Sequence, residues 1–338
     1  MRTTFISTRS MSEATRLTLL KSQVKFAQAS QEAVTGRFAD VGIALGHKTG
    51  QTVSFRQDIE RLDSISKSND VASTRLDAAQ LTLKGLVSQA DAFNKSAILY
   101  ASAPNGALST SEAQAMFNSF LDKLNSTNDG AYLFAGINSD VKPVAYSTAA
   151  ETSVQTAFAA VSGGNPATVS PAAMAAFLDG PFADLFNDTN WKANWSQASD
   201  TNIRSRVATN EMIDTSTNAN EQPFRDLMRA ATMMSQLGNA QLPAETQRVV
   251  AQKASSILSS ALTALSNVQA TLGVSEQRIA DSNERMSLQK DMIGNRIGML
   301  EGVDQAEASV RVNELEKQIE MSYAITGKIQ KLNILDYL

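Results

Sequence analysis

Two long heptad runs, one in each half of the chain, constrain the fold of this sequence more than any other feature. Apolar positions recur at alternating steps of three and four over residues 55–100, and a weaker run covers residues 258–300. This spacing places the side chains on one stripe of a helix, which packs lengthwise on another helix. Because a helix rises about 1.5 Å per residue, the first run predicts a helix of roughly 70 Å. The runs are Phe55, Asp58, Leu62, Ile65, Asn69, Ala72, Leu76, Ala79, Leu83, Leu86, Ala90, Phe93, Ala97 and Tyr100, and then Leu258, Leu262, Leu265, Gln269, Leu272, Glu276, Ile279, Asn283, Met286, Lys290, Ile293, Ile297 and Leu300.

Both ends of the chain carry a narrower stripe with the same rhythm. Several of its positions are small or polar, so each terminal helix is marginal alone and needs a partner. If the chain runs out along one half and returns along the other, the two terminal helices lie side by side. The stripes are Leu17, Leu20, Val24, Ala27, Gln31 and Val34, and Val312, Leu315, Ile319, Ser322, Thr326 and Ile329.

These terminal stripes predict an assembly interface, because long helices with amphipathic ends build assemblies more often than they catalyse reactions. The alternative is two surface helices of an ordinary helical domain. We expect the interface to use Leu17, Leu20, Val24, Val34, Val312, Leu315, Ile319 and Ile329, together with Leu332 and Leu335 of the apolar ending LNILDYL.

Glycines recur every four residues at two corresponding places, between each terminal stripe and the neighbouring heptad run. Each glycine destabilises a helix by about 1 kcal/mol relative to alanine. The spacing therefore predicts a hinge, or a close crossing, in both halves of the chain. Coincidence is the alternative, since the chain holds 17 glycines. The hinge positions are Gly42, Gly46, Gly50, Gly294, Gly298 and Gly302.

The composition excludes much of enzyme chemistry. With no cysteine and a single histidine, the chain has no thiolate nucleophile, disulfide or Cys-bearing zinc site. His47 lies in the segment LGHKTGQT, where a solvated or hinge histidine is the simpler interpretation. We therefore predict a protein that is not an enzyme, with no catalytic residue, no metal site and no cofactor.

The charge and hydropathy of the chain also limit its partners. A net charge of −4 provides no basic surface for nucleic acid. The sequence has no run of 18 apolar residues, so we expect no membrane span. Its first twenty residues lack the apolar core and cleavage site of a secretory signal.

The middle of the chain differs from both heptad runs. Alanine, glycine, serine and proline dominate residues 145–200, which predicts a small insert of mixed, partly irregular structure with Trp191 and Trp195 as core anchors. The segment AYLFAG (131–136) has strand character and is expected to pair with residues 201–216 in a β-hairpin. Helical spacing of Met228, Met233 and Met234, with Met212 upstream, favours a core over an adaptable binding groove.

Together these patterns predict a mainly α fold. Both chain ends form an elongated antiparallel helical bundle, a coiled-coil rod, with a small β-hairpin and a short mixed α/β insert in mid-chain. The expected divisions are an N-terminal helix (1–42), a first rod part (43–144), the inserted domain (145–200), a second rod part (201–302) and a C-terminal helix (303–338).

Three stretches resemble the flagellin superfamily of bacterial flagellar axial proteins. They are VTGRFADVGIALG (34–46), DGAYLFAGINSD (129–140) and the ending LNILDYL (332–338). The run Tyr-Leu-Phe-Ala-Gly followed by Asn and Asp is the most specific, and it is similar to the hook-associated members that join hook and filament. One departure is Thr35-Gly36-Arg37, where that family has Ser-Gly-Lys-Arg.

The resemblance implies a structural subunit of the flagellum, exported without a cleaved signal peptide and located outside the cell. It further implies a ring of copies of the chain as a junction adaptor, with the first hook-associated protein and flagellin as neighbours. An export chaperone is expected to bind the C-terminal region, and neither nucleic acid nor a membrane is an expected partner.

Two alternatives remain. The chain can instead be a flagellin, the filament subunit itself, which resembles it at both ends. A secreted helical binding protein or enzyme would need a polar constellation in residues 145–200. The acidic residues there, Asp179, Asp184, Asp188 and Asp200, show no metal-ligand or acid–base spacing.

Overall fold

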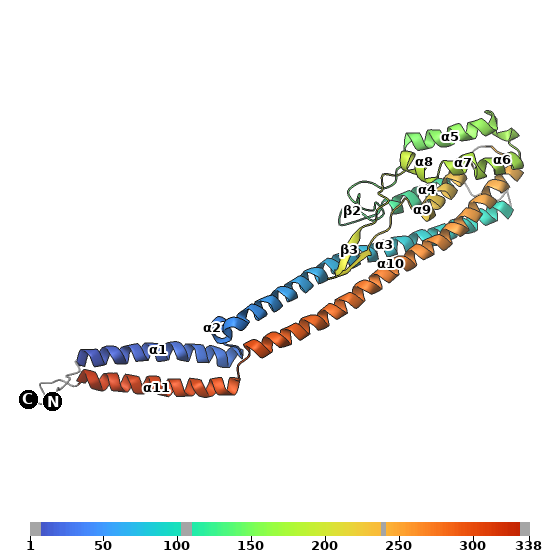
Figure 1. Cartoon of the computed structure of the whole chain (residues 1–338). Helices are drawn as coiled ribbons and strands as arrows, with labels where there is room; N and C mark the ends of the chain where they lie inside the picture. Colours follow the sequence, from blue (N-terminus) through green and yellow to red (C-terminus); the bar gives the residue numbers. More distant parts are fainter. Residues whose placement is uncertain (1–7, 103–109, 238–240, 332–338) are drawn as a thin grey trace, which may run out of the picture. The chain divides into compact units, whose positions relative to one another are not determined.

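The computed structural model describes residues 8–102, 110–237 and 241–331, and helices dominate it (Figure 1). The terminal helices are α1 (Thr8–Thr35) and α11 (Gln305–Lys331), and the long central helices are α3 (Thr49–Ser102) and α10 (Ala244–Glu301). The predicted mainly α class, with long helices from both ends packing together, is confirmed. The shorter elements are α2 (Val41–Leu45), η1 (Gly46–Lys48), α4 (Thr110–Leu124), β1 (Thr127–Asn128), β2 (Ala131–Tyr132), α5 (Thr148–Ser162), η2 (Pro166–Thr168), α6 (Pro171–Asp179), α7 (Pro181–Asp184), α8 (Asp188–Asn194), β3 (Arg204–Ala208), β4 (Glu211–Asp214), α9 (Gln222–Thr232) and η3 (Met233–Leu237).

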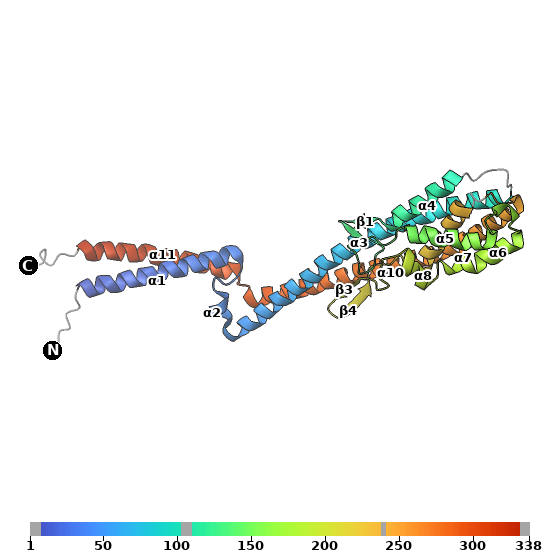
Figure 2. The same ribbon diagram turned by 90° about the horizontal axis from the view of Figure 1, so that it is seen from above.

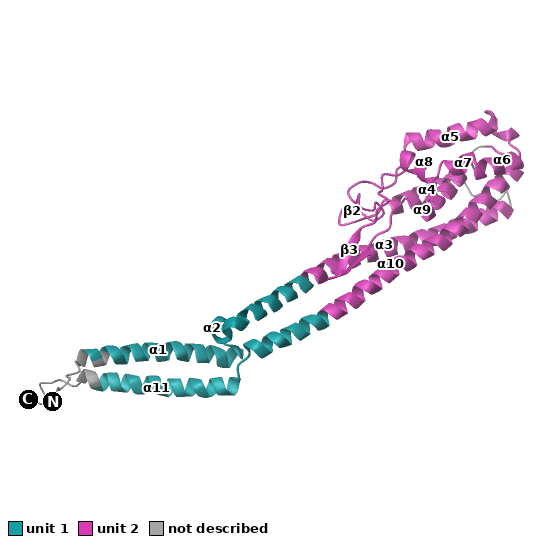
Figure 3. Cartoon of the chain, in the orientation of Figure 1, with its two compact units in different colours: residues 1–63, 287–338 teal, residues 64–286 magenta. Residues whose placement is uncertain are grey.

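The chain divides into two compact units, which Figure 3 colours separately. Unit 1 consists of residues 1–63 and 287–338, and unit 2 of residues 64–286. The start of α3 and the end of α10 belong to unit 1, and the rest of both helices belongs to unit 2. Each long helix therefore contributes to both units.

The predicted heptad stripes form the seam between α3 and α10. The two helices lie side by side in both ribbon views (Figures 1 and 2). All predicted positions on both helices are buried or half-buried. The fully buried leucines of these two stripes are Leu76, Leu83, Leu86, Leu258 and Leu265.

Helix α10 contains an 18-residue window with a mean hydropathy of 1.2, long and apolar enough by composition to cross a membrane. A single such helix is weak evidence, because core helices pass the same test. Leu258 and Leu265 of α10 are buried in the core cluster of unit 2 that also contains Leu83, so core packing explains part of this apolar content.

A polar layer interrupts the apolar seam at the two predicted asparagine positions. The amide nitrogen of Asn69 donates to Oδ1 of Asn283 at 2.7 Å and to the carbonyl of Val207 at 3.0 Å. The hydroxyl of Ser282 donates to the same carbonyl at 2.6 Å. Val207 lies in β3, so this layer binds the β3–β4 hairpin to both long helices. A buried asparagine at a seam position selects one register of paired helices, because a shifted register would leave its amide unpaired.

The strands pair differently from the prediction, which was wrong in joining AYLFAG to residues 201–216. Strand β2 pairs with β1, and β3 pairs with β4 through a bulge between Arg206 and Ala208. The turn between β1 and β2 has positive φ at Asp129 and Gly130, the pattern of a tight two-residue hairpin turn. This local turn pairs the segment with its neighbour in sequence. With the later region the AYLFAG segment forms an isolated bridge, from Ala135 to Asn218, rather than a strand ladder.

The AYLFAG segment is part of the core of unit 2. Leu133 and Phe134 are buried, and the ring of Phe134 lies 5.5 Å from that of Phe224. The carbonyl of Tyr132 accepts a hydrogen bond of 2.8 Å from the guanidinium of Arg75 on α3. The segment that carries the strongest resemblance therefore positions the mid-chain elements on α3.

Gly136 ends this segment at a position that only glycine fits. Its φ is +63°, and a Cβ atom there would lie 2.6 Å from the carbonyl oxygens of both Ser199 and Thr201. These two backbone segments bond to the neighbours of Gly136, through Ser199 N to Ala135 O at 3.0 Å and Ile137 N to Thr201 O at 3.0 Å. Hydrogen bonds on both sides of Gly136 therefore hold its backbone close to residues 199–201.

Residues 145–200 are helical, whereas the sequence predicted a mixed α/β insert. Helices α5, α6 and α8 each start at a side-chain cap, from Ser147, Ser170 and Asn187 respectively. Such caps satisfy a free amide at the first turn, so short alanine-rich segments form helices once they can pack. Their apolar residues join the same core cluster as α3, α4 and α10.

The predicted anchors of this region are confirmed as core residues. Trp191 and Trp195 are buried and stack with ring centroids 5.6 Å apart. Burial, together with the nearby charge of Glu151, raises the pKa of Tyr146 to about 12, so this phenol stays neutral. Met228, Met233 and Met234 are also buried, whereas Met212 is exposed.

We expect Gly136→Ala to destabilise the protein much more than Gly130→Ala. Both positions have positive φ, which costs about 1 kcal/mol for a residue with a Cβ. Gly130 has open space around it, whereas the new methyl at Gly136 meets two carbonyl oxygens, which adds at least about 2 kcal/mol. Chemical denaturation of both variants measures the difference. Equal losses of stability would contradict the packing argument.

Candidate assembly interface

The terminal helices α1 and α11 pair side by side in both ribbon views (Figures 1 and 2). Their facing positions follow heptad spacing and include several small residues, which allow two helices to approach closely. Only Ser22, Ala29, Ala308 and Leu315 of these positions are buried, and the others are half-buried. The facing positions are Thr15, Leu19, Ser22, Phe26, Ala29 and Ala33 on α1, and Ala308, Val312, Leu315, Ile319, Ser322 and Thr326 on α11.

The structure separates the predicted interface residues into two groups. Val312, Leu315 and Ile319 face α1. The predicted α1 residues Leu17, Leu20, Val24 and Val34 instead lie on its exposed side, and Val34 is 79% exposed. The side chain of Ile329 and the residues Leu332 and Leu335 lie outside the described part of the chain.

Sequence reasoning missed the facing stripe of α1 because it lies two positions away from a more apolar stripe. Thr15 and Ser22 are polar, so the facing stripe has a weaker hydrophobic signal than the one through Leu17 and Val24. A helix that carries two apolar stripes can contact two partners. In this chain α11 contacts the stripe of α1 through Ser22 and Ala29, and the stripe through Leu17 and Val24 stays exposed.

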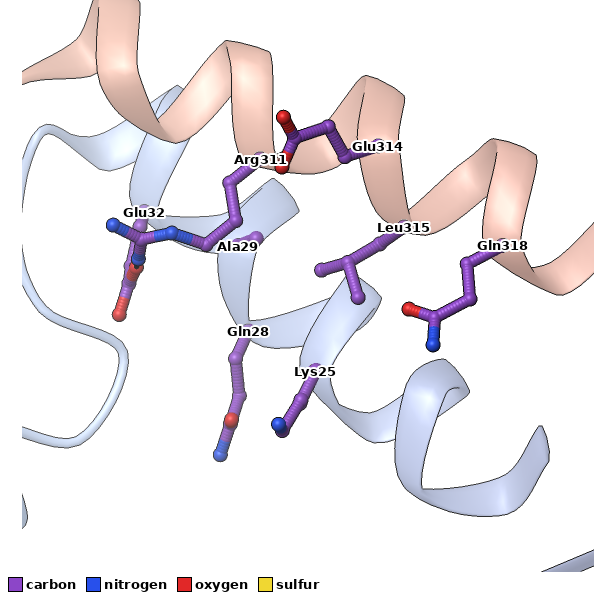
Figure 4. Close-up of a pocket in the computed structure, with 8 residues that line it drawn as sticks. All are labelled: Lys25, Gln28, Ala29, Glu32, Arg311, Glu314, Leu315 and Gln318. Atoms are coloured by element: carbon purple, nitrogen blue, oxygen red, sulfur yellow. Dashed lines mark hydrogen bonds and ion pairs between the residues drawn. The ribbon is translucent and has the colours of Figure 1, made fainter. Parts of the chain in front are cut away.

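Polar contacts fix the register of the α1–α11 pair. The amide of Gln23 donates to the hydroxyl of Tyr323 at 2.9 Å. Arg311 forms ion pairs with Glu32 at 3.2 Å and with Glu307 at 2.9 Å. Between these cross-links lies an open groove of about 370 Å³, shown in Figure 4. Its lining is Lys25, Gln28, Ala29, Glu32, Arg311, Glu314, Leu315 and Gln318.

A buried carboxylate fastens the ends of three helices in unit 1. Glu301, the last residue of α10, is 1% exposed. The guanidinium of Arg56 on α3 donates to both of its oxygens, at 2.9 and 2.6 Å. Arg37, just after α1, lies 3.2 Å from the same carboxylate. We call this group, Arg37, Arg56 and Glu301, the ionic clasp.

Backbone bonds reinforce the ionic clasp. The amide of Phe38 donates to the carbonyl of Glu301 at 3.0 Å, and the amide of Val303 donates to the carbonyl of Gly36 at 2.9 Å. Gly36 has φ of +68°, and a Cβ at Gly302 would lie 2.5 Å from the carbonyl of Gly298. The non-helical connections that follow α1 and precede α11 are therefore hydrogen-bonded to each other.

The six glycines of the predicted hinge fall on different elements. Gly42 lies in α2, Gly46 ends it with φ of +53°, and Gly50 lies in the first turn of α3. Gly294 and Gly298 lie within the continuous helix α10, whereas Gly302 follows its end. Flexibility at these positions stays a prediction.

Unit 1 buries few side chains of its own. In its described residues the buried positions are Ser22, Ala29, Thr52, Leu62, Ile297, Glu301, Ala308 and Leu315. Most of the large apolar side chains that are exposed also belong to this unit, although it is the smaller one. Exposed apolar side chains in such density mark a surface that associates with another molecule.

The described residues offer no alternative metal centre, since they contain no group of three or more His, Asp or Glu side chains placed to hold an ion. His47, the one histidine of the sequence, is exposed. The acidic residues of the mid-chain serve other contacts: Asp188 and Asp200 both bind Lys192, at 2.7 and 2.6 Å.

Comparison with known families matches both ends of the chain. Residues 6–139 match the bacterial flagellin N-terminal helical region, and residues 255–338 match the bacterial flagellin C-terminal helical region. The two matches together cover more than half of the chain, including α1, α3, α11 and the AYLFAG segment. No curated protein matched the sequence.

We expect Leu315→Asp to disrupt the pairing of α1 with α11 inside the monomer, and Val24→Asp to disrupt only the association between copies. Leu315 is 9% exposed on the α1–α11 seam, so a carboxylate there costs several kcal/mol and separates the two helices in the monomer. Val24 is 58% exposed, so its variant keeps the pair intact and loses only self-association. Hydrogen exchange of residues 13–35 and 305–328, followed by sedimentation, distinguishes these effects. Normal self-association of Val24→Asp would exclude this stripe from the interface.

A second prediction concerns the ionic clasp. Glu301→Gln leaves two guanidinium groups without their carboxylate, so unit 1 should lose about 1–3 kcal/mol of local stability. Hydrogen exchange should accelerate in residues 30–60 and 290–315 and stay unchanged in residues 110–230. Glu307→Gln is the matched control, because its ion pair is exposed and lies within one helix. Equal effects of both variants would contradict a special role of the clasp.

Proposed function

This chain belongs to the flagellin superfamily, and we propose that within it the chain is the junction adaptor between hook and filament, the role of hook-associated protein 3. Flagellin-family proteins are structural, non-enzymatic subunits that are exported and form extracellular flagellar filaments. The family also implies self-assembly of this chain into a flagellar polymer. What we propose is the specific position of this chain in the flagellum, between hook and filament.

The observation that carries the proposal is the sequence of residues 129–140. Its run Tyr-Leu-Phe-Ala-Gly resembles the hook-associated class, and filament subunits would not usually contain it. The residues of this run that lie in the core of unit 2 are Leu133, Phe134 and Ala135. A departure in this run would change how the mid-chain elements pack on α3, so the run is a marker of a particular architecture of unit 2.

The terminal helices support assembly as the mode of action. Their exposed stripe through Leu17, Leu20 and Val24 has no partner in the described part of the chain. We therefore propose a ring of copies that contacts the first hook-associated protein on one side and flagellin on the other. We further propose that an export chaperone covers the C-terminal region beforehand, and that the chain is exported without a cleaved signal peptide.

Deletion of the gene tests the junction role. We expect cells that keep their hooks, shed filament protein into the medium and do not swim. Re-expression of the wild-type chain should restore attached filaments, whereas the Val24→Asp variant should be exported without restoring them. Attached filaments of normal length in the deletion strain would overturn the proposal.

Labelling separates the junction adaptor from the alternative, a flagellin. An exposed residue of unit 2, such as Ser260, can be replaced by cysteine and labelled with a maleimide dye, because the chain has no cysteine of its own. A junction adaptor gives one spot at the base of each filament. Label along the whole filament would identify the chain as the filament subunit.

A further inference from the structure

The exposed side of α1 is basic as well as apolar. Arg16, Lys21 and Lys25 are exposed and alternate with the exposed apolar residues Leu17, Leu20 and Val24. Figure 4 shows Lys25 and Gln28 on α1 at the edge of the α1–α11 groove that they help to line. We call this surface, Lys21 and Lys25 with Leu17, Leu20 and Val24, the basic face; Lys25 lies at its edge, where it also lines the α1–α11 groove.

The exposed side of α11 has the opposite character. Glu314, Glu316 and Glu320 are exposed, with Met321, 60% exposed, next to them. Lys317 is the one exposed cation between these carboxylates, so the segment keeps a negative balance. We call this surface, Glu316, Glu320 and Met321 of α11, the acidic face; Glu314 lies apart from it and lines the α1–α11 groove.

Neither face satisfies the other within the chain. Among the described residues, Lys21, Lys25, Glu316 and Glu320 have no ion-pair partner. The Gln23–Tyr323 bond and the Glu32–Arg311 pair set an antiparallel register in which the described residues of the two faces form no ion pair with each other. Both faces therefore carry unpaired charge and uncovered apolar side chains.

We infer that the basic face of one copy binds the acidic face of a second copy. This inference rests on the proposed assembly through the terminal helices and assigns it a direction. Charge complementarity identifies the partner of each face as a second copy of the chain, because each copy carries both faces and can use both at once. Such a heterologous contact builds a ring when its rotation closes and a helical array when it does not. The apolar residues supply burial, while the charges choose the register and suppress basic-to-basic pairing.

Charge reversal in the full-length protein tests this contact. We compare Lys21→Glu/Lys25→Glu with Glu316→Lys/Glu320→Lys by sedimentation, at low salt and at about 1 M salt, where the Debye length falls to about 3 Å. Each double variant should associate roughly tenfold more weakly than the wild type at low salt, because like charges then face each other. The wild type itself should weaken at high salt.

Mixing the two double variants is the decisive measurement. Each variant lacks self-complementarity, but the basic α1 of one matches the acidic α11 of the other, so the mixture should recover association to within about threefold of the wild type. Recovery by mixing can only occur between chains. Lys67→Glu/Lys84→Glu, which changes the same net charge on exposed positions of α3, should associate like the wild type.

Neutral variants protect the test against misfolding. Lys21→Gln/Lys25→Gln and Glu316→Gln/Glu320→Gln should keep the helix content in circular dichroism and lose the salt dependence of association. The inference is overturned if the wild type does not associate, if both reversals associate normally, or if the mixture fails to recover. Its failure leaves the junction role open, because the deletion strain tests that role separately.

Discussion

The burial of one apolar stripe along α3 against α10 supports the rest of unit 2. Both helices are long because their heptad rhythm continues without a slip, and the buried leucines between them form a seam that the Asn69–Asn283 layer interrupts. The Asn69–Asn283 bond fixes the register of this seam, and the amide of Asn69 also donates to the carbonyl of Val207. The β3–β4 hairpin, the AYLFAG segment and the helices of residues 145–200 all pack on a surface that this seam positions.

Unit 1 follows a different principle. Its helices are paired by small residues, cross-linked by a few polar contacts and fastened by the ionic clasp around Glu301. A unit with so little core of its own gains stability when further copies cover its exposed stripes. The same exposed residues that weaken the monomer are available for assembly, which suits a flagellar structural subunit.

The segment that best marks the class of this protein contributes to its core. Gly136 and Phe134 are required by close packing, so their presence reports the architecture of unit 2. The proposed contacts with other copies involve more ordinary residues, such as Lys21, Val24 and Glu316, which form no distinctive motif. The run that best marks the class and the proposed interface therefore lie in different parts of the chain.

The sequence alone determined the long helices, the pairing of the chain ends and the stripe of α11 through Val312, Leu315 and Ile319, because heptad periodicity directly encodes which side of a helix is buried. Tertiary structure decided what periodicity leaves open. On α1 it placed the weaker stripe, through Ser22 and Ala29, against α11, since close packing of small side chains outweighs hydrophobicity there. It also made residues 145–200 helical through caps and a shared core, and it gave AYLFAG a local partner through the Asp129–Gly130 turn. Each of these outcomes depends on neighbours that are distant in sequence or on backbone geometry that composition does not reveal.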